Sequence, residues 1–136
     1  KKFIIIIGPF YKEKNKLKKF FSKYENVKIY ISPLNILNMI KKVDLVICAG
    51  GHTVYEALFF KKIVLSIQLW KNQNNTGRSL YLQNLEIIKY SKNELYFLKV
   101  FKKALLNLEK KLIKKIIYKK RFSIEYDNFK KNMMGL

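Results

Sequence analysis

The sequence predicts an α/β protein with a Rossmann-like parallel sheet flanked by helices, followed by a helical C-terminal extension. Two observations lead to this class. Short apolar runs rich in β-branched residues alternate with segments in which apolar residues recur every three or four positions, which is typical of strands joined by helices. In addition, residues 45–49 form an uninterrupted apolar run of strand length, as expected for a parallel strand covered on both faces.

The order of these segments gives the expected elements. Strands are predicted at residues 2–7, 27–31, 45–49, 63–67 and 86–88. Helices are predicted at residues 12–24, 34–40 and 76–85, after the glycine pair at 50–51, and from residue 93 onward, with a polar loop at 68–75. We therefore expect a Rossmann-like part over residues 1–90 and a helical, basic part of the same domain over residues 91–136. Because Lys1 leads directly into a strand, the chain is expected to be a fragment of a longer protein.

The composition narrows the class of partner. The 29 Lys+Arg residues against 9 Asp+Glu give a net charge of +20, which raises nucleic acid or an anionic membrane as a partner. Only Arg78 and Arg121 are arginines, however, and readers of phosphates and bases favour the arginine fork, so the dominance of lysine argues against nucleic acid. The lone Cys48 lies inside an apolar strand and is interpreted as a small core residue. With no apolar run of membrane-spanning length, the expected location is the cytoplasm.

A basic segment near the C-terminus leaves two interpretations open. Residues 99–121 hold ten basic residues and only Glu109 as an acid, together with a stripe of leucine and isoleucine. The stripe can lie on an anionic bilayer, which would make the protein peripheral to the inner face of the membrane. Alternatively, the stripe packs on the sheet and the lysines are solvated.

The glycine pair after the central strand is the first candidate site. Gly50 and Gly51 let the chain turn sharply into a helix that Thr53 or His52 is expected to cap. A strand feeding a helix in this way aims backbone N–H groups and the positive helix end at one point, which suits a phosphate. Glu56, one turn into the helix, can accept hydrogen bonds from sugar hydroxyls. The alternative is that Gly50-Gly51 only makes a tight strand-to-helix connection.

A second candidate follows the next strand. Residues 70–74, Trp-Lys-Asn-Gln-Asn, supply amides that can hydrogen-bond a sugar or a diphosphate, or they form a solvated polar turn. The carboxyl ends of parallel strands are where ligands bind in such sheets. The loops at residues 8–11, 49–53 and 68–76 are therefore expected to meet there.

Several standard sites are missing from the sequence. There is no G-x-G-x-x-G after the first strand, no G-x-x-x-x-G-K-[ST], and only one histidine, so no cofactor or metal is expected. His52 is interpreted as a phosphate contact or a helix cap, with a general base as the alternative.

Taken together, residues 44–57 (Asp-Leu-Val-Ile-Cys-Ala-Gly-Gly-His-Thr-Val-Tyr-Glu-Ala), 64–67 (Val-Leu-Ser-Ile) and 71–73 (Lys-Asn-Gln) resemble the C-terminal half of GT-B fold nucleotide-sugar enzymes. The Asn72-Gln73 pair makes the chain most similar to the UDP-sugar hydrolases of pseudaminic acid biosynthesis. It more distantly resembles the N-acetylglucosaminyltransferases that make the lipid-linked peptidoglycan precursor. The resemblance covers residues 2–88, and its specific part is residues 44–73.

The resemblance implies roles for individual residues. Catalytic positions would be Asn72 and His52. Nucleotide-sugar-binding positions would be Gly8, Gly50, Gly51, Thr53, Glu56 and Gln73. Two departures are visible: His52 stands where such relatives more often have serine or threonine, and Gly8-Pro9-Phe10 is less glycine-rich than their first turn.

The function implied is binding of a UDP-sugar in an enzyme that cleaves or transfers the sugar of a UDP-amino sugar. A hydrolase of nonulosonic (pseudaminic-type) acid biosynthesis is favoured over the donor-binding domain of a family 28-like glycosyltransferase. The family's general-base histidine belongs to an N-terminal half that these residues do not include. The partner would therefore be that N-terminal domain or a separate acceptor-binding subunit. A basic nucleic-acid or membrane-surface binding module is the alternative of another class.

Overall fold

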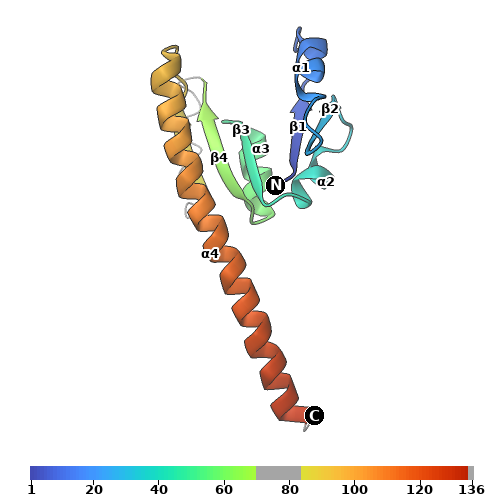
Figure 1. Ribbon diagram of the computed structural model, residues 1–136, viewed down its shortest axis with the longest axis vertical. Helices are drawn as coiled ribbons and strands as arrows, with labels where there is room; N and C mark the ends of the chain where they lie inside the picture. The colour runs from blue at the N-terminus through green and yellow to red at the C-terminus, as the bar shows by residue number, and fades with distance from the viewer. Residues whose placement is uncertain (70–83, 135–136) are drawn as a thin grey trace. The chain divides into compact units, whose positions relative to one another are not determined.

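The protein forms two compact units, Lys1–Asn38 and Met39–Leu136. The structure, a computed structural model, describes the backbone of residues 1–69 and 84–134 and the side chains of residues 1–69 and 84–120 (Figure 1). Each unit contains parallel strands with at least one helix, so the predicted parallel α/β class is confirmed. The described strands form two small sheets, β1-β2 and β3-β4-β5, where the sequence pattern predicts one. The predicted division of the domain between residues 90 and 91 stays a prediction.

The first unit is a β-α-β module. Strand β1 (Phe3–Ile7) pairs in parallel with β2 (Val27–Ile31), with Phe3 opposite Val27 and Ile7 opposite Ile31. Parallel neighbours need a crossover connection, and helix α1 (Lys14–Phe21) supplies it. The helix is shorter at both ends than the periodicity of residues 12–24 predicts.

Helix α2 (Ile36–Lys41) leads from the first unit into the second. The side-chain oxygen of Asn35 accepts a hydrogen bond of 3.0 Å from the backbone N–H of Asn38, which is the contact of an N-cap residue. Ile40, near the end of the helix, is buried in the core of the second unit.

The second unit is built on a parallel sheet of three strands in the order β3-β4-β5. The strands are β3 (Leu45–Ala49), β4 (Ile63–Gln68) and β5 (Leu85–Lys89). Val46 lies opposite Val64, and Val64 lies opposite Leu85, so the side chains of these three paired residues are on the same face of the sheet. The predicted helix over residues 76–85 lies mostly outside the described residues, and its last residue belongs to β5.

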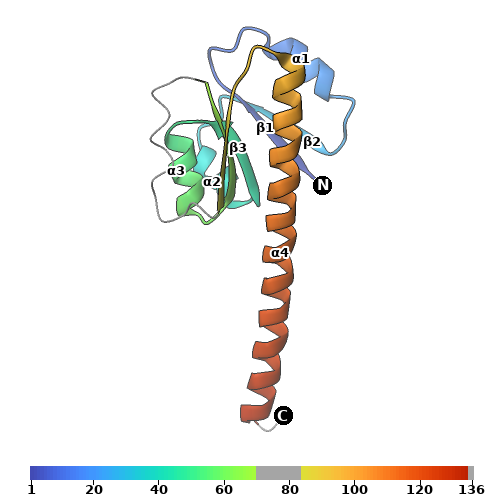
Figure 2. The same ribbon diagram turned by 90° about the vertical axis from the view of Figure 1, so that its left-hand side faces the viewer.

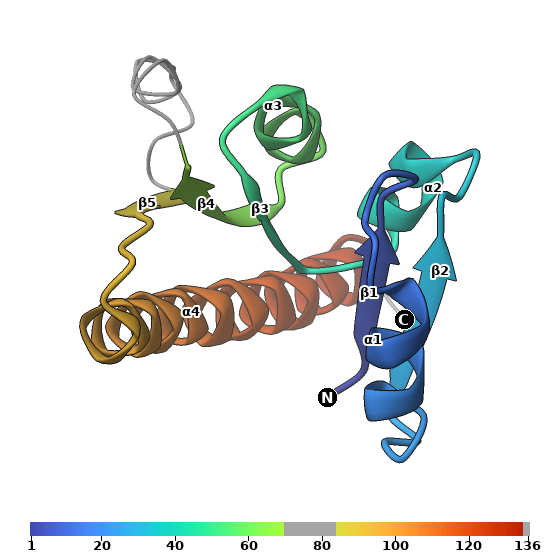
Figure 3. The ribbon, with the colours of Figure 1, turned by 90° about the horizontal axis from the view of Figure 1, so that it is seen from above.

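Helices cover both faces of this sheet, as the apolar runs predict. Figure 3 shows α3 (His52–Phe59) on one face and α4 (Glu94–Met134) on the other. The core under α3 consists of Ile40, Val46, Val54, Ala57, Leu58, Val64 and Leu85. The core under α4 consists of Ile63, Leu65, Ile88, Ala104 and Leu108. Consecutive residues from Ile63 to Leu65 therefore enter opposite cores, which is why β4 is apolar except for Ser66 and its last residue, Gln68.

Helix α4 confirms the predicted C-terminal helix and is far longer than the strands on which it packs. The side chain of Asn93 caps its start by accepting a bond of 3.0 Å from the N–H of Tyr96, and Glu94 lies in the positive first turn. Its 41 residues span about 60 Å, whereas strands of five or six residues span about 20 Å. The helix consequently continues past the sheet of its own unit (Figure 2). Among the described residues, no helix is long and apolar enough to cross a bilayer.

Candidate functional site

The connection between β3 and α3 is the part of the predicted site that the structure describes most fully. Strand β3 ends at Ala49, and the backbone N–H of Gly50 donates a bond of 3.1 Å to the carbonyl oxygen of Ile67 on β4. This bond holds the turn against the neighbouring strand. The N–H of Gly50 is therefore used within the fold and is not one of the free donors that the motif predicts.

Gly51 occupies the N-cap position of α3, and the predicted side-chain cap is wrong. Helix α3 begins at His52, so His52 and Thr53 are its first two residues and neither occupies the N-cap position. Gly51 is extended, with φ 177° and ψ −161°, and a Cβ built on it would meet no atom within 4 Å. Neither backbone strain nor packing requires glycine here. Because Gly51 has no side chain, the space in front of the helix end is open.

The start of α3 has the properties of an anion site. In the first turn of α3 the N–H of Val54 donates a bond of 3.1 Å to the carbonyl oxygen of Gly51, and the N–H groups of His52 and Thr53 have no acceptor inside the helix. No side chain of the described residues caps them, and the first turn holds no acidic residue. Gly51 and His52 are exposed and Thr53 is half-buried. The positive end of the helix and its unpaired donors are thus accessible to a negatively charged group.

The charge of Glu56 affects the pKa of Cys48 across this connection. Burial raises the pKa of the Cys48 thiol to about 11, and the negative charge of Glu56 contributes to the same direction. The Glu56 side chain is half-buried and lies close enough to the end of β3 to act on that thiol. A thiol with this pKa stays neutral near pH 7 and is a poor nucleophile. Cys48 instead packs against the core under α3, in agreement with its interpretation as a core residue.

The described part of the chain does not test whether the remaining predicted site residues come together. Gly8 follows β1 in the first unit, where its carbonyl accepts a bond from the N–H of Tyr11. Asn72 and Gln73 lie outside the described residues. Gly50, Gly51, His52, Thr53 and Glu56 share one strand-to-helix connection. Their convergence with Gly8, Asn72 and Gln73 stays a prediction.

One buried polar group near this connection was not singled out by the sequence reasoning. The hydroxyl of Ser66 is fully buried on β4 and has no hydrogen-bond partner among the described residues. Ser66 lies opposite Cys48 in the parallel register, two residues before the end of β4. In the sequence, Ser66 could have been noticed as the one polar residue of the predicted strand at 63–67. The described residues hold no group of three or more His, Cys, Asp and Glu side chains that fits a metal ion.

Comparison with known proteins adds one relative. No family model matches the chain. The chain is similar to the uncharacterized protein MJ1062 of Methanocaldococcus jannaschii, with 35% identity over 98 residues. The match covers 70% of this chain and 19% of the relative, so the chain spans about a fifth of that protein's length. The relative's description carries no activity that could be compared with the site.

Proposed function

We propose that this chain is the UDP-sugar-binding domain of a GT-B type enzyme that acts on a UDP-amino sugar. The favoured activity is that of a hydrolase in nonulosonic (pseudaminic-type) acid biosynthesis. The observation that carries the proposal is the β3–α3 connection: a parallel strand leads through Gly50 and Gly51 into an uncapped helix end, with Glu56 one turn further on. This arrangement suits a diphosphate followed by a ribose.

The chemistry at this connection would be electrostatic. The first-turn N–H groups and the dipole of α3 would stabilise the negative charge that develops on the leaving UDP. Glu56 would accept hydrogen bonds from the ribose hydroxyls, and the exposed His52 is near enough in sequence to reach a phosphate bound at the helix end. Asn72 and Gln73 would contact the phosphates and the sugar. Water would be the acceptor in a hydrolase.

A family 28-like glycosyltransferase would use the same donor site. The residues proposed here bind only the UDP-sugar, so a sugar or lipid-linked acceptor would enter from the N-terminal domain or from a separate subunit. The two activities differ in the fate of the sugar rather than in this site.

A basic binding module is the competing function, and the net charge of +20 favours it. Binding of RNA to dispersed lysines should fall steeply with salt, because each neutralised phosphate releases counterions. A site built mainly from backbone donors should respond less to salt.

Thermal unfolding with UDP tests the proposal. A ligand at about 100-fold excess over its dissociation constant stabilises the folded state by about 2.7 kcal/mol, which raises the unfolding midpoint by several degrees in a domain of this size. Glu56→Gln should reduce the shift with UDP and leave the shift with pyrophosphate, because only UDP carries the ribose. Glu25→Gln, which removes the same charge from an exposed loop position, is the matched control.

Gly51→Val sharpens the test. The backbone at Gly51 is extended and the Cβ position is open, so valine should fit without a clash. The midpoint without ligand should fall only slightly, because a non-capping residue at an N-cap costs about 1 kcal/mol. Its side chain would fill the space in front of α3 and abolish the UDP shift. The absence of a shift with UDP or any other nucleotide in the parent chain would rule the proposal out.

A further inference from the structure

The part of α4 that continues past the sheet carries apolar side chains that are exposed among the described residues of its own unit. Among the side chains that the structure describes, Leu112 is the last of α4 that packs against the core under this helix. Just beyond it, Ile113, Ile116 and Ile117 are 50%, 55% and 60% exposed. Their spacing of three and four residues puts them on one side of the helix, and we refer to these three residues as the isoleucine patch. Large apolar side chains gathered in this way mark a surface that contacts another body.

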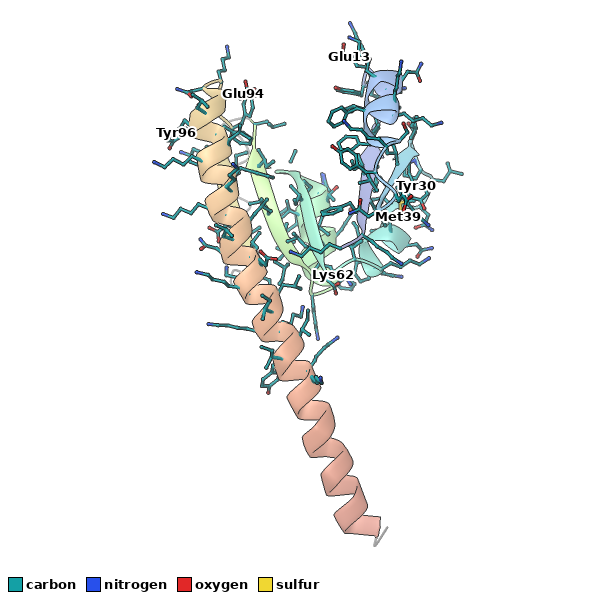
Figure 4. All side chains as sticks on the ribbon, in the orientation of Figure 1. Glu13, Tyr30, Met39, Lys62, Glu94 and Tyr96 are labelled. Carbon is teal, nitrogen blue, oxygen red and sulfur yellow. The ribbon has the colours of Figure 1, made fainter. Side chains whose placement is uncertain are left out.

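Lysines from two elements surround the same stretch. Lys61 and Lys62 lie in the turn between α3 and β4, and the Nζ of Lys115 on α4 donates a bond of 2.6 Å to the carbonyl oxygen of Lys61. Figure 4 shows Lys62 near the end of the sheet that α4 passes. The pKa of Lys115 lies below its ordinary value, first because of burial and then because of the charges of Lys119 and Lys62. Asp44 acts in the opposite direction and Lys61 in the same one. Positive charge is therefore concentrated where the helix leaves the sheet.

This end of the sheet is opposite to the candidate nucleotide site. Lys61 and Lys62 directly precede the first residue of β4, whereas Gly50 and Gly51 directly follow the last residue of β3. Because β3 and β4 are parallel, the two features lie at opposite ends of these strands. A partner at the lysines and a ligand at the glycines can consequently be bound at the same time.

Charge decides between the possible partners. From Lys110 to Lys120, α4 has six lysines and no acidic residue. A second copy of the chain on the isoleucine patch would bring two such lysine arrays together, and like charges across an interface are unfavourable. RNA would match the lysines but would leave the isoleucines in water. An anionic bilayer accommodates both, since the isoleucines can enter the acyl boundary while the long lysine stems reach the headgroups.

Lys115 follows Ile113 by two residues, so Lys115 and the Lys61–Lys62 turn that it contacts lie on the other side of α4 from the isoleucine patch. Lys110 and Lys120 lie three or four residues from isoleucines of the patch and border it. We propose that this side of α4, from Lys110 to Lys120, binds the surface of a bilayer that contains anionic phospholipid. The isoleucine patch supplies the apolar contact and the lysines supply the attraction to lipid headgroups. Because one short apolar patch binds weakly by itself, attachment should require both signals and should be reversible.

Vesicle sedimentation with the full chain tests this assignment. The probe is vesicles of equal parts phosphatidylcholine and phosphatidylglycerol, compared with phosphatidylcholine alone. We expect binding to the anionic vesicles to be at least about tenfold tighter and to weaken as added salt screens the lysines. Equal binding to both vesicle types, or binding to neither, would overturn the proposal.

Two pairs of variants separate this surface from general stickiness. Replacing the three isoleucines of the patch by serine should lower vesicle binding about tenfold, because the apolar contact is lost. Phe10→Ser with Leu34→Ser changes exposed apolar residues of the first unit and should leave binding unchanged. Circular dichroism checks that both variants keep the parent's helix content.

The charge pair is designed in the same way. Lys110→Glu with Lys120→Glu, which border the isoleucine patch, should lower binding more than Lys12→Glu with Lys28→Glu, although both pairs change the net charge equally. Equal losses would reduce the effect to overall charge and contradict the proposal. A patch variant that loses a dimer in light scattering, while the parent ignores vesicles, would assign the patch to a second copy of the chain. The UDP shift of the patch variant should equal that of the parent, so this test and that of the nucleotide site can fail independently.

Discussion

Cys48 and Glu56 form the one described pair whose chemistry reports on the candidate site. The thiol packs against the core under α3, while the carboxylate belongs to the second turn of α3 and is half-buried. Burial and the Glu56 charge both disfavour the thiolate, which gives the thiol its pKa of about 11. The pKa of this thiol therefore indicates whether the Glu56 carboxylate lies near the end of β3, where a ribose at the helix end would contact it.

Glu56→Gln should make Cys48 more reactive. Removing the negative charge lowers the pKa of the thiol, so more thiolate is present at any pH below that pKa. Because one pKa unit changes the thiolate fraction tenfold, we expect alkylation by iodoacetamide at about pH 9 to accelerate between about two- and tenfold. Mass spectrometry of the alkylated chain measures the rate, and Glu25→Gln should leave it unchanged. An unaltered rate in Glu56→Gln would mean that the carboxylate is not near the end of β3.

The glycine turn illustrates what single residues in a sequence do and do not determine. Leu45–Ala49 was predictable to the residue, because an apolar run between Asp44 and the glycine pair has only one place to be a strand. The N-cap residue of α3 was not predictable, since Gly51, His52 and Thr53 can all occupy an N-cap position. Gly51 occupies it in the structure, and the helix that follows buries Val54, Ala57 and Leu58. That burial depends on the packing and not on the local pattern.

The apolar stripe of α4 was predictable, but its division between sheet and solvent was not. Phe97, Phe101, Ala104, Leu108 and Leu112 belong to or pack against the core under α4. Leu95, Leu98 and Ile116, which the same three-to-four-residue pattern includes, are exposed. The pattern of one helix cannot reveal where its partner sheet ends, and five- or six-residue strands cover only part of a 41-residue helix.

Two leucines of α4 that are two residues apart in the sequence test this division of the helix between sheet and solvent. Leu108 is 1% exposed and lies in the core, whereas Leu106 is 59% exposed. Leu108→Ala should lower the free energy of unfolding by about 2–5 kcal/mol, because it removes buried methyl groups and leaves a cavity. Leu106→Ala should change it by less than about 0.5 kcal/mol. Urea unfolding followed by circular dichroism measures both, and equal losses would contradict the register in which α4 packs on the sheet.

The two units of the molecule differ in how much apolar surface they bury. In the first unit Ile7 is the only buried residue, and Phe3, Ile4, Tyr30 and Ile31 of its two strands are exposed. In the second unit, helices cover both faces of a three-stranded sheet. A segment of fewer than about 40 residues seldom buries enough surface to be stable alone. The sequence hides this difference, because both units show equally apolar strands.

Hydrogen exchange should therefore separate the two units. Amide protection reflects the free energy of the opening that exposes each amide, and it is highest in central, fully buried elements. Strand β4 is hydrogen-bonded on both sides, and its residues from Ile63 to Ser66 are all buried. We expect the amides of β4 to exchange at least about a hundredfold more slowly than those of β1 and β2, since a difference of about 2.7 kcal/mol in opening free energy corresponds to that ratio. Mass spectrometry of peptic fragments resolves the strands, with the exposed turn at residues 22–26 as the fast reference. Equal protection of β1 and β4 would mean that the first unit is stabilised by more than the burial of Ile7.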